Sequence, residues 1–282
     1  MKILKNALLS NFSNFKIGGP AREIVLIENS EELKEVLEGD FLVFGHGTNV
    51  LFPDEGLDKR VIFNRTGLFH MDGTWIVADS GTSLQEVVKA SVDRGLSGLE
   101  YLAGIPGTIG GAIFGNAGAF GKQIGDYVIE VEYWKNSKLI KEKNLYFGYR
   151  ESVFKRKGGV ITKAWLKLRR GTGKEKKIME NILSRRAKKH PPHNVPCAGS
   201  FFKNVVLPSG EKIPAGALLE SVGAKGLRVG GAKVFEGHAN FIINDGGATA
   251  RDVLTLAEIL KRKVKEHFGI ILEEEVIIVR AS

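Results

Sequence analysis

The stretch "AGIPGTIGGAIFGNAGAFG" (103–121) contains seven glycines and one proline, and no charged residue interrupts it. A glycine inside a helix or strand costs roughly 0.5–1 kcal/mol relative to alanine, so a regular element gains nothing from this composition. Backbone that lacks Cβ atoms can instead lie against a polar group with its N–H donors exposed, and phosphate is the usual partner. The stretch therefore predicts a loop that binds a phosphate-containing ligand.

A second glycine-rich turn, "GHGTNVL" (45–51), directly follows "FLVF" (41–44), which we predict to be a short buried strand. Proteins that alternate strands and helices place phosphate-binding turns at the ends of strands. The Gly-x-Gly-x-x-Gly pattern of dinucleotide-binding folds does not occur in the sequence. Two separate turns suit a ligand longer than one phosphate, such as a diphosphate joined to a large planar group.

The length of 282 residues gives room for two or three domains with a sizeable core. No apolar run reaches the ~20 residues that span a bilayer, and the N-terminus lacks a signal-peptide pattern. The single cysteine, Cys197, excludes an internal disulfide and fits a reducing compartment. We therefore expect a cytoplasmic protein without a membrane partner.

Lysine and arginine exceed the acidic residues by 41 − 32 = 9, and fourteen basic residues lie between Lys155 and Lys189. Three interpretations are open: a nucleic-acid surface, a solvated basic helix, or a site for a small polyanion. After Trp165 no aromatic side chains are interleaved with these charges, and no nucleic-acid-binding motif occurs. We therefore expect no nucleic-acid partner.

The periodicity of apolar residues predicts alternating strands and helices. Ser30 is expected to cap a first helix, and capping boxes are expected at Ser83 and Thr249, with Gly269 ending the last helix. The whole chain is predicted to be α+β with three modules. The expected strands are 22–28, 41–44, 60–64, 75–80, 127–134, 159–168 and 270–279, and a basic helix is expected over 174–189.

Three polar residues stand in apolar or aromatic settings: Arg150 in "YRESVFK" (149–155), Ser200 in "AGSFFKN" (198–204), and Glu275 in the last predicted strand. In a regular strand Glu275 shares a face with Ile271, Ile277 and Val279, which predicts partial burial. A buried carboxyl tends to a raised pKa and can stay protonated near neutrality.

Each of these residues also has an ordinary interpretation. Ser200 can be a plain strand residue, Arg150 can belong to a surface ion pair, and Glu275 can face solvent on an edge strand. Ser200 also lacks the Gly-x-Ser-x-Gly elbow of a hydrolase nucleophile. The six histidines have no metal-ligand spacing with Cys197, so we expect no metal site.

Taken together, the motifs resemble those of the bacterial UDP-N-acetylenolpyruvoylglucosamine reductases. The resemblance covers nearly the full length, and its segments occur in order. "GIPGTIGGA" and "GSFFKN" are specific by themselves. The segments are "NFKIGGPA" (14–21), "GHGTNVL" (45–51), the glycine-rich stretch 103–121, "YRESVFK" (149–155), "AGSFFKN" (198–204), "GLRVGGAKV" with "HANFIIN" (226–244), and a terminal "LEEEV".

The resemblance implies a two-module FAD-binding region of the PCMH-type flavoprotein superfamily, expected over 1–60 and 61–172. It implies a C-terminal α+β substrate domain over 173–282, whose last strand returns to the active site. FAD is expected to bind noncovalently, with NADPH as the reductant. The residues implied to bind FAD are Gly45, His46, Gly47, Thr48, Asn49, Val50, Leu51, Ala103, Gly104, Ile105, Pro106, Gly107, Thr108, Gly110, Gly111, Asn116, Ala117 and Gly118.

The resemblance also implies a reaction: reduction of UDP-N-acetyl-enolpyruvoylglucosamine to UDP-N-acetylmuramate in peptidoglycan precursor synthesis. Hydride reaches C3 of the enol ether. Ser200 then gives the proton to C2, and Arg150 and Glu275, the latter in its acid form, stabilise the enolate. We expect the protein to act as a monomer on small molecules. The residues implied on the substrate side are Tyr149, Lys203, Asn204, Lys225 and Arg228.

Two departures and two alternatives accompany the resemblance. The spacing between 155 and 198 leaves little room for the tyrosine-bearing loop of some members, so the chain resembles the shorter subclass. His46 lies where distant flavoproteins attach flavin covalently, although "GHGTN" suits noncovalent binding better. A different FAD oxidase of the superfamily should lack "GSFFKN", and a non-enzymatic nucleotide-binding protein would not explain the glycine loops.

Overall fold

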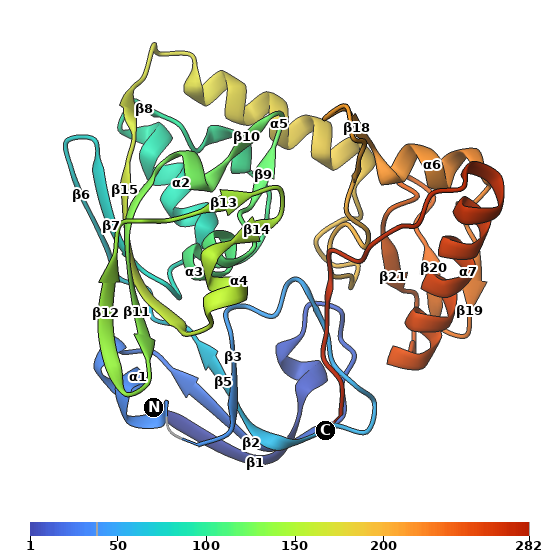
Figure 1. The fold of residues 1–282 in the computed structure, drawn as a ribbon, viewed down its shortest axis with the longest axis horizontal. Coiled ribbons are helices and arrows are strands. Elements are labelled where there is room, and N and C mark those ends of the chain that lie inside the picture. The colour runs from blue at the N-terminus through green and yellow to red at the C-terminus, as the bar shows by residue number, and fades with distance from the viewer. Residues whose placement is uncertain (38, 282) are drawn as a thin grey trace. The chain divides into compact units, whose positions relative to one another are not determined.

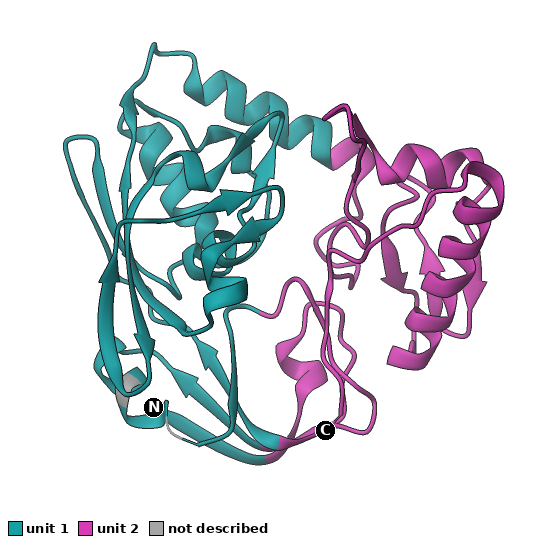
Figure 2. Ribbon diagram, in the orientation of Figure 1, with its two compact units in different colours: residues 1–5, 23–46, 59–186 teal, residues 6–22, 47–58, 187–282 magenta. Residues whose placement is uncertain are grey.

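The computed structural model describes residues 1–37 and 39–281 and has the α+β architecture that the sequence predicts (Figure 1). Its contacts divide the chain into two compact units, which Figure 2 colours separately. The predicted boundaries after residues 60 and 172 stay predictions. The first unit comprises Met1–Lys5, Glu23–His46 and Lys59–Arg186, and the second comprises Asn6–Arg22, Gly47–Asp58 and Ala187–Ser282.

A four-stranded sheet has the order β1-β2-β5-β3, and β3 runs parallel to β5. Val25, Ile27 and Ile62 of this sheet form a core with Leu33 and Val36 of helix α1. The strand Phe41–Phe44 is half-buried rather than fully buried. The elements are β1 (Lys2–Leu8), β2 (Pro20–Ile27), α1 (Ser30–Val36), β3 (Phe41–Phe44) and β5 (Leu57–Asn64).

The N-cap of α1 is Asn29, so the prediction of Ser30 was wrong by one residue. The Asn29 side-chain oxygen accepts a hydrogen bond from the Glu31 N–H at 3.0 Å, and Ser30 is the first helical residue. Asparagine and serine are both good caps, and a local pattern does not decide between neighbours. The second predicted cap, Ser83, is confirmed as the N-cap of α2, because its side chain accepts from the Glu86 N–H at 3.5 Å; of the capping box predicted there, this is the half that the described residues show.

A five-stranded antiparallel sheet forms the larger part of the first unit, in the order β12-β11-β15-β7-β6. Helices α2 and α3 pack on it through apolar side chains such as Leu84, Val88 and Ile109. The elements are β6 (Phe69–Asp72), β7 (Trp75–Asp79), α2 (Leu84–Asp93), α3 (Ile109–Phe114), β11 (Val128–Lys135), β12 (Lys138–Glu142) and β15 (Val160–Lys167).

Short elements complete this unit, and of these β14, α4 and η3 contact α3 (Figure 1). Three antiparallel pairs connect segments that are distant or adjacent in the chain: β8 with β16, β9 with β10, and β13 with β14. The elements are β8 (Leu96–Ser97), η2 (Glu100–Leu102), β9 (Gly118–Ala119), β10 (Lys122–Gln123), η3 (Ile124–Asp126), β13 (Phe147–Gly148), β14 (Glu151–Ser152), α4 (Val153–Lys157), β16 (Arg169–Arg170) and the basic helix α5 (Glu175–Lys189).

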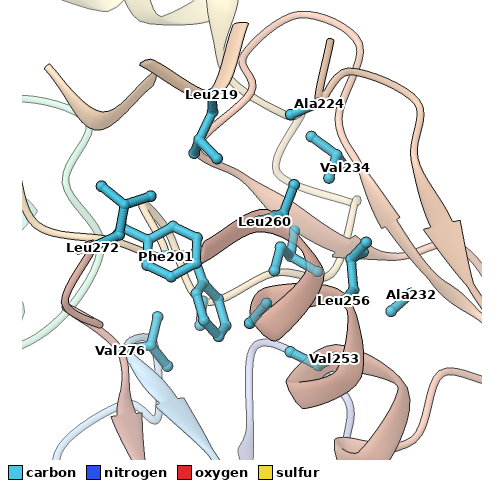
Figure 3. Packing of buried hydrophobic residues seen from close by; sticks show 14 of the residues in the cluster. Phe201, Leu219, Ala224, Ala232, Val234, Val253, Leu256, Leu260, Leu272 and Val276 are labelled. Carbon is cyan, nitrogen blue, oxygen red and sulfur yellow. The ribbon is translucent and has the colours of Figure 1, made fainter. Parts of the chain in front are cut away.

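The second unit is built around helix α7, whose predicted capping box of Thr249 and Asp252 is present and whose C-cap, Gly269, has a φ of 69°. Figure 3 shows its apolar core, in which Phe201 lies among side chains of α6, α7 and β20. The elements are η1 (Leu9–Phe12), β4 (Val50–Leu51), β17 (Val205–Val206), β18 (Lys212–Ile213), α6 (Ala215–Ser221), β19 (Arg228–Val229), β20 (Ala232–Val234), β21 (Ile242–Asn244), α7 (Ala250–Phe268) and β22 (Ile277–Ile278).

The predicted strand over 270–279 is mostly wrong. Only β22 (Ile277–Ile278) forms a strand, parallel to β4, and one isolated bridge joins Glu274 to Phe202. The expected face is only partly confirmed: Glu275 and Val279 are half-buried, but Ile271 is 68% exposed and Ile277 is 40% exposed. Leu272 and Val276 enter the core instead, since the segment packs through irregular extended backbone.

No helix in the described part of the chain is long and apolar enough to cross a membrane.

Candidate active site

The segment that carries Ser200 is paired on one edge with the segment that carries Glu275. The Glu275 N–H donates to the Phe201 carbonyl at 2.8 Å, and the Lys203 N–H donates to the Glu273 carbonyl at 2.8 Å. These bonds flank the antiparallel bridge between Phe202 and Glu274. Two predicted catalytic residues, 75 positions apart (275 − 200) in the chain, are therefore carried by neighbouring backbone.

Ser200 is half-buried, and its hydroxyl has no hydrogen-bond partner in residues 1–37 and 39–281. Gly199 before it has a φ of 80°, a left-handed conformation that a side chain would strain. Phe201 and Phe202 after it are 1% exposed and lie edge to face at 5.1 Å between ring centroids. Buried anchors on one side and a tight turn on the other thus fix the backbone of Ser200 while its hydroxyl stays available.

Arg150 lies in the turn of the β13–β14 hairpin with a φ of 55°, which is uncommon for a residue with a side chain. Its Nη1 donates to the Gly118 carbonyl at 3.0 Å, and Lys155 Nζ donates to the Arg150 carbonyl at 2.6 Å. Its guanidinium also lies over the Tyr149 ring, 5.5 Å from the centroid. Arg150 is therefore tied directly to the glycine-rich stretch.

The two predicted glycine-rich turns meet in the first unit at Gly45 and Thr108. A Cβ on Gly45 would lie 2.5 Å from Thr108 Oγ1, which is closer than side chains tolerate. Thr108 Oγ1 in turn accepts from the Gly111 N–H and caps α3. Close contact between the turns explains the glycine at position 45 and places both on one surface.

The expectation that the glycines free their N–H groups for a ligand holds only in part. Gly110 is required because a Cβ there would meet Ser80 at 2.7 Å, and its N–H donates to the Ser80 carbonyl. The Gly104 N–H donates to Gln85, whose amide also donates to the Ile105 carbonyl. The backbone N–H groups of Gly107 and Thr108 have no protein acceptor within the described residues. These two amides remain for a ligand.

Asn116 and Gly118 serve the internal structure of the loop. Asn116 is 1% exposed, and its side chain donates to Gln123 at 2.7 Å and to the Gly148 carbonyl at 2.6 Å. It also accepts from the Gly125 N–H at 3.1 Å. Gly118 belongs to the β9–β10 pair. The Asn116 side chain is thus committed to the protein, and Ala117 beside it is half-buried.

Residues 47–51 belong to the second unit, where they contact the segment of Glu275. The Asn49 side chain donates to the Glu275 carbonyl at 3.2 Å, and the Ile277 N–H donates to the Asn49 carbonyl at 3.1 Å. Val50 and Leu51 form β4 and are buried. A Cβ on Gly47 would lie 2.2 Å from the Phe12 carbonyl oxygen. This turn therefore positions Glu275 in addition to any role in cofactor binding.

The predicted substrate-side residues of the second unit fall into two groups. Lys203 and Asn204 follow Ser200 directly; Lys203 Nζ lies 3.2 Å from Glu273, and the Asn204 side chain accepts from the Ala215 N–H. Lys225 and Arg228 lie after α6, where they form ion pairs with Glu220 and Asp245. Only the first group is brought next to Ser200 along the backbone.

Two profile matches and several full-length relatives show the family of this chain. The profile of the UDP-N-acetylenolpyruvoylglucosamine reductase C-terminal domain matches residues 190–279, and that of an FAD binding domain matches residues 21–138. The UDP-N-acetylenolpyruvoylglucosamine reductase of Pseudothermotoga lettingae is 42% identical over 95% of this chain and 94% of its own length. The chain belongs to the UDP-N-acetylenolpyruvoylglucosamine reductase family.

Two further members of the reductase family match over almost their whole length. The protein of Caldanaerobacter subterraneus is 38% identical over 99% of this chain and 94% of its own. The crystal structure of UDP-N-acetylenolpyruvylglucosamine reductase from Thermus caldophilus superimposes with a TM-score of 0.85 at 35% identity, covering 99% of this chain and 100% of that chain. The fold and the family agree with the motifs that the sequence presents.

The residues present fit the FAD of this reductase family. The Gly107 and Thr108 amides lack protein acceptors within the described chain, and they lie where the two glycine-rich turns meet. Backbone N–H donors without acceptors suit the oxygens of a diphosphate. Among the described residues there is also no group of three or more His, Cys, Asp or Glu side chains that could hold a metal ion.

Sequence reasoning missed two residues, one in each unit, that contact segments of the predicted site. Arg186 of α5 lies against the glycine-rich stretch, since a Cβ on Gly104 would meet its Cδ at 2.9 Å. Burial, and then the nearby positive charge of Arg150, lower the pKa of Arg186. Asn240, a polar residue in the apolar run "ANFII", contacts Phe202. A buried polar side chain inside such a run is the signal that could have identified it.

Proposed function

We propose that this chain carries out the reaction of its family with Ser200 as the proton donor to the substrate, and with Arg150 and Glu275 as the groups that stabilise the enolate. The reaction is the NADPH-dependent reduction of UDP-N-acetyl-enolpyruvoylglucosamine to UDP-N-acetylmuramate, a step of peptidoglycan precursor synthesis. FAD supplies the hydride that the enol ether receives at C3.

Once C3 has received hydride, negative charge develops on C2 and on the adjacent carboxylate of the substrate. The protein must stabilise this charge and then deliver a proton to C2. A serine hydroxyl is a weak acid, and it becomes an adequate donor only beside a developing carbanion. The Ser200 hydroxyl suits this role because it makes no hydrogen bond to another protein group in the described chain.

Glu275 and Arg150 are proposed to act on the enolate. Glu275 is half-buried, and its backbone is fixed by Phe201 on one side and by the Asn49 side chain on the other. Arg150 is held at its carbonyl by Lys155 and at its guanidinium by Gly118. Groups that are fixed before the reaction cost no reorganisation when charge develops, which makes their stabilisation effective.

Positive charge in the first unit supports binding of anionic reactants. Arg186 has no carboxylate within ion-pair distance in the described residues, and the positive charge of Arg150 repels it. A desolvated guanidinium beside a like charge is relieved by an anion. NADPH and the UDP-sugar are both polyanions. The basic helix α5, to which Arg186 belongs, therefore favours a small polyanion over nucleic acid.

The remaining assignments follow the same proposal. Tyr149, Lys203 and Asn204 are proposed to contact the UDP-sugar, with Lys225 and Arg228 on its more exposed side. We propose a monomer that acts on small molecules in the cytoplasm, with no membrane or nucleic-acid partner. The reduced state of the single thiol, Cys197, suits that compartment, and burial raises its pKa, which keeps it protonated.

The observation that carries the proposal is the backbone pairing of residues 201–203 with residues 273–275. The test follows NADPH oxidation by the FAD-loaded protein without oxygen, with and without the enolpyruvyl UDP-sugar. We expect continuous turnover only with the UDP-sugar, and UDP-N-acetylmuramate in amounts equal to the NADPH consumed. Steady turnover with oxygen but not with the UDP-sugar would identify a different FAD oxidase.

A further inference from the structure

Asn240 is a buried polar residue to which the proposed chemistry gives no role. It is 4% exposed, and it lies between Ala239 and Phe241, both of which are buried. A buried amide without hydrogen-bond partners is strongly unfavourable, so the partners of the Asn240 side chain indicate its role. Every bond recorded for its side chain goes to one residue, Phe202.

The Asn240 side chain pairs with Phe202 in the manner of a neighbouring strand. Its Oδ1 accepts from the Phe202 N–H at 2.9 Å, and its Nδ2 donates to the Phe202 carbonyl at 2.8 Å. Its own carbonyl accepts from the Phe201 N–H at 2.8 Å. The N–H and the carbonyl of Phe202 fix the orientation of the Asn240 amide. A flipped amide would place its NH2 group against the Phe202 N–H and its oxygen against the Phe202 carbonyl.

The opposite edge of the same backbone is occupied by the Glu275 segment. The Phe201 carbonyl accepts from Glu275, and the Lys203 N–H donates to Glu273. The segment 201–203 is therefore held from both edges: by Asn240 on one side and by residues 273–275 on the other. Within residues 1–37 and 39–281 Ser200 makes no hydrogen bond, so its position depends on the neighbouring backbone of Phe201.

We infer that Asn240 is a positioning residue for proton delivery by Ser200, holding the backbone of Phe201 and Phe202 so that the hydroxyl keeps its alignment with C2 of the substrate. This inference rests on the proposed role of Ser200. Asn240 reaches no reacting atom itself. It acts through two hydrogen bonds from its side chain to the backbone of Phe202, one as acceptor and one as donor. A carboxylate, a smaller side chain or an apolar side chain cannot make both of these bonds.

The test replaces Asn240 in the full-length, FAD-loaded protein and measures the two half-reactions separately by stopped flow. Asn240→Asp keeps the shape but loses the donor to the Phe202 carbonyl. We expect reduction by NADPH to stay within about twofold and reoxidation by the UDP-sugar to slow by about 10-fold to 100-fold, since small misplacements of a reacting group have effects of this size. The KM for the UDP-sugar should change little, and the solvent deuterium isotope effect on reoxidation should rise.

Asn244→Asp is the matched control. Asn244 lies on β21, four residues further along, and its amide donates to the Phe15 carbonyl at 3.2 Å while its oxygen accepts from Gly246 and Ala248. Asn244→Asp also removes a side-chain donor to a backbone carbonyl, but this carbonyl belongs to Phe15 and not to residues 200–203. We expect a loss of stability without a selective loss of the UDP-sugar half-reaction. Equal losses in both variants would make Asn240 an ordinary structural residue and overturn the inference.

A double-mutant cycle separates this inference from the proposed function. If Asn240 acts through Ser200, Asn240→Asp should slow reoxidation by less than about twofold in a Ser200→Ala background, because coupled residues are not additive. Additive losses would contradict the inference and leave the role of Ser200 intact. If Ser200→Ala were reoxidised by the UDP-sugar at the native rate, that result would instead contradict the proposed function itself.

Asn240→Ser provides a milder variant in case the carboxylate prevents folding. Its hydroxyl ends one bond short of the amide atoms that contact Phe202, and the smaller volume admits water that can bridge to the Phe202 N–H. We expect the same selective slowing of the UDP-sugar half-reaction. If neither variant folds and binds FAD, Asn240 is a stability residue, and the inference is wrong.

Discussion

The backbone N–H of Glu275 donates to the carbonyl oxygen of Phe201 at 2.8 Å. This bond fixes the segment of Glu275 beside the segment of Ser200 through main-chain atoms alone. The side chains of residues 200 and 275 take no part in this bond, so replacing them does not remove it. Substitutions at these two positions should report on chemistry more than on folding.

Neutral replacements of the two proposed enolate-stabilising groups test their role. We predict that Glu275→Gln and Arg150→Gln each slow reduction of the UDP-sugar by about two to three orders of magnitude, the effect of one charge-stabilising group at ~3–4 kcal/mol. Reduction by NADPH should change much less. Stopped-flow absorbance of the flavin measures both steps in one sample.

Arg150→Lys is the control for charge at the same strained position. It keeps the positive charge and the left-handed backbone, but it loses the planar fork that reaches Gly118. We expect a rate between those of the native protein and Arg150→Gln. Equal damage to both half-reactions in all three variants would mean that these residues hold the flavin or the fold.

The mode of FAD attachment is predicted to be noncovalent. The turn that contains His46 packs Gly45 directly on Thr108, and two backbone amides beside it are available to a diphosphate. Acid precipitation should therefore leave the flavin absorbance in the supernatant. Flavin that stays with the precipitated chain, and is lost from it in His46→Ala, would show a covalent bond to His46.

Local signals account for much of what could be predicted. The capping box of Thr249 and Asp252 and the end of α7 at Gly269 depend on residues close in sequence, and both are present. The segment 270–279 was mispredicted because its pairing is set by β4 and Phe202, more than 70 residues earlier (274 − 202 = 72). The local alternation of apolar and polar residues carries no information about strand pairing over such separations.

The site itself was predicted in its motifs but not in its contacts. The motifs identified the glycine-rich turns, Ser200 and Glu275. The sequence alone could not show that the Asn116 side chain is used internally, or that Asn49 donates to the Glu275 carbonyl. The sequence also could not predict the contact between Asn240 and Phe202. The Asn240 side chain makes the hydrogen bonds that a neighbouring strand would make, and such a side chain can come from any part of the chain.

The pH dependence of stability is predicted from His238. Burial is the main cause that lowers the pKa of His238; Lys189 and Lys225 lower it further, and Glu220 opposes them. Its Nδ1 accepts from the Asn240 N–H, which a proton on that nitrogen would prevent. The unfolded chain takes up this proton near pH ~6.5 and the folded chain only below that, so the free energy of unfolding should fall as pH decreases through this window.

His238→Asn removes the titration and offers a side-chain oxygen as acceptor in place of Nδ1. We predict that the native protein loses more stability than this variant between about pH 7.5 and about pH 5.5, measured by denaturant unfolding. A loss of packing against Gly216 would lower the free energy of unfolding by the same amount at both pH values, so it does not change the difference between them. Parallel losses in the two proteins would exclude His238 as the source.

The role of Ser200 is tested most directly by following one flavin signal through both half-reactions of Ser200→Ala. The alanine removes the hydroxyl but keeps Gly199 and the two buried phenylalanines that shape the turn. The variant should be yellow, lose its colour with NADPH at a near-native rate, and then be reoxidised by the UDP-sugar without oxygen only at a small but measurable fraction of the native rate. Ser200→Cys should recover part of the activity, because a thiol can give a proton. Reoxidation of the reduced alanine variant by the UDP-sugar at the native rate would contradict the proposed mechanism.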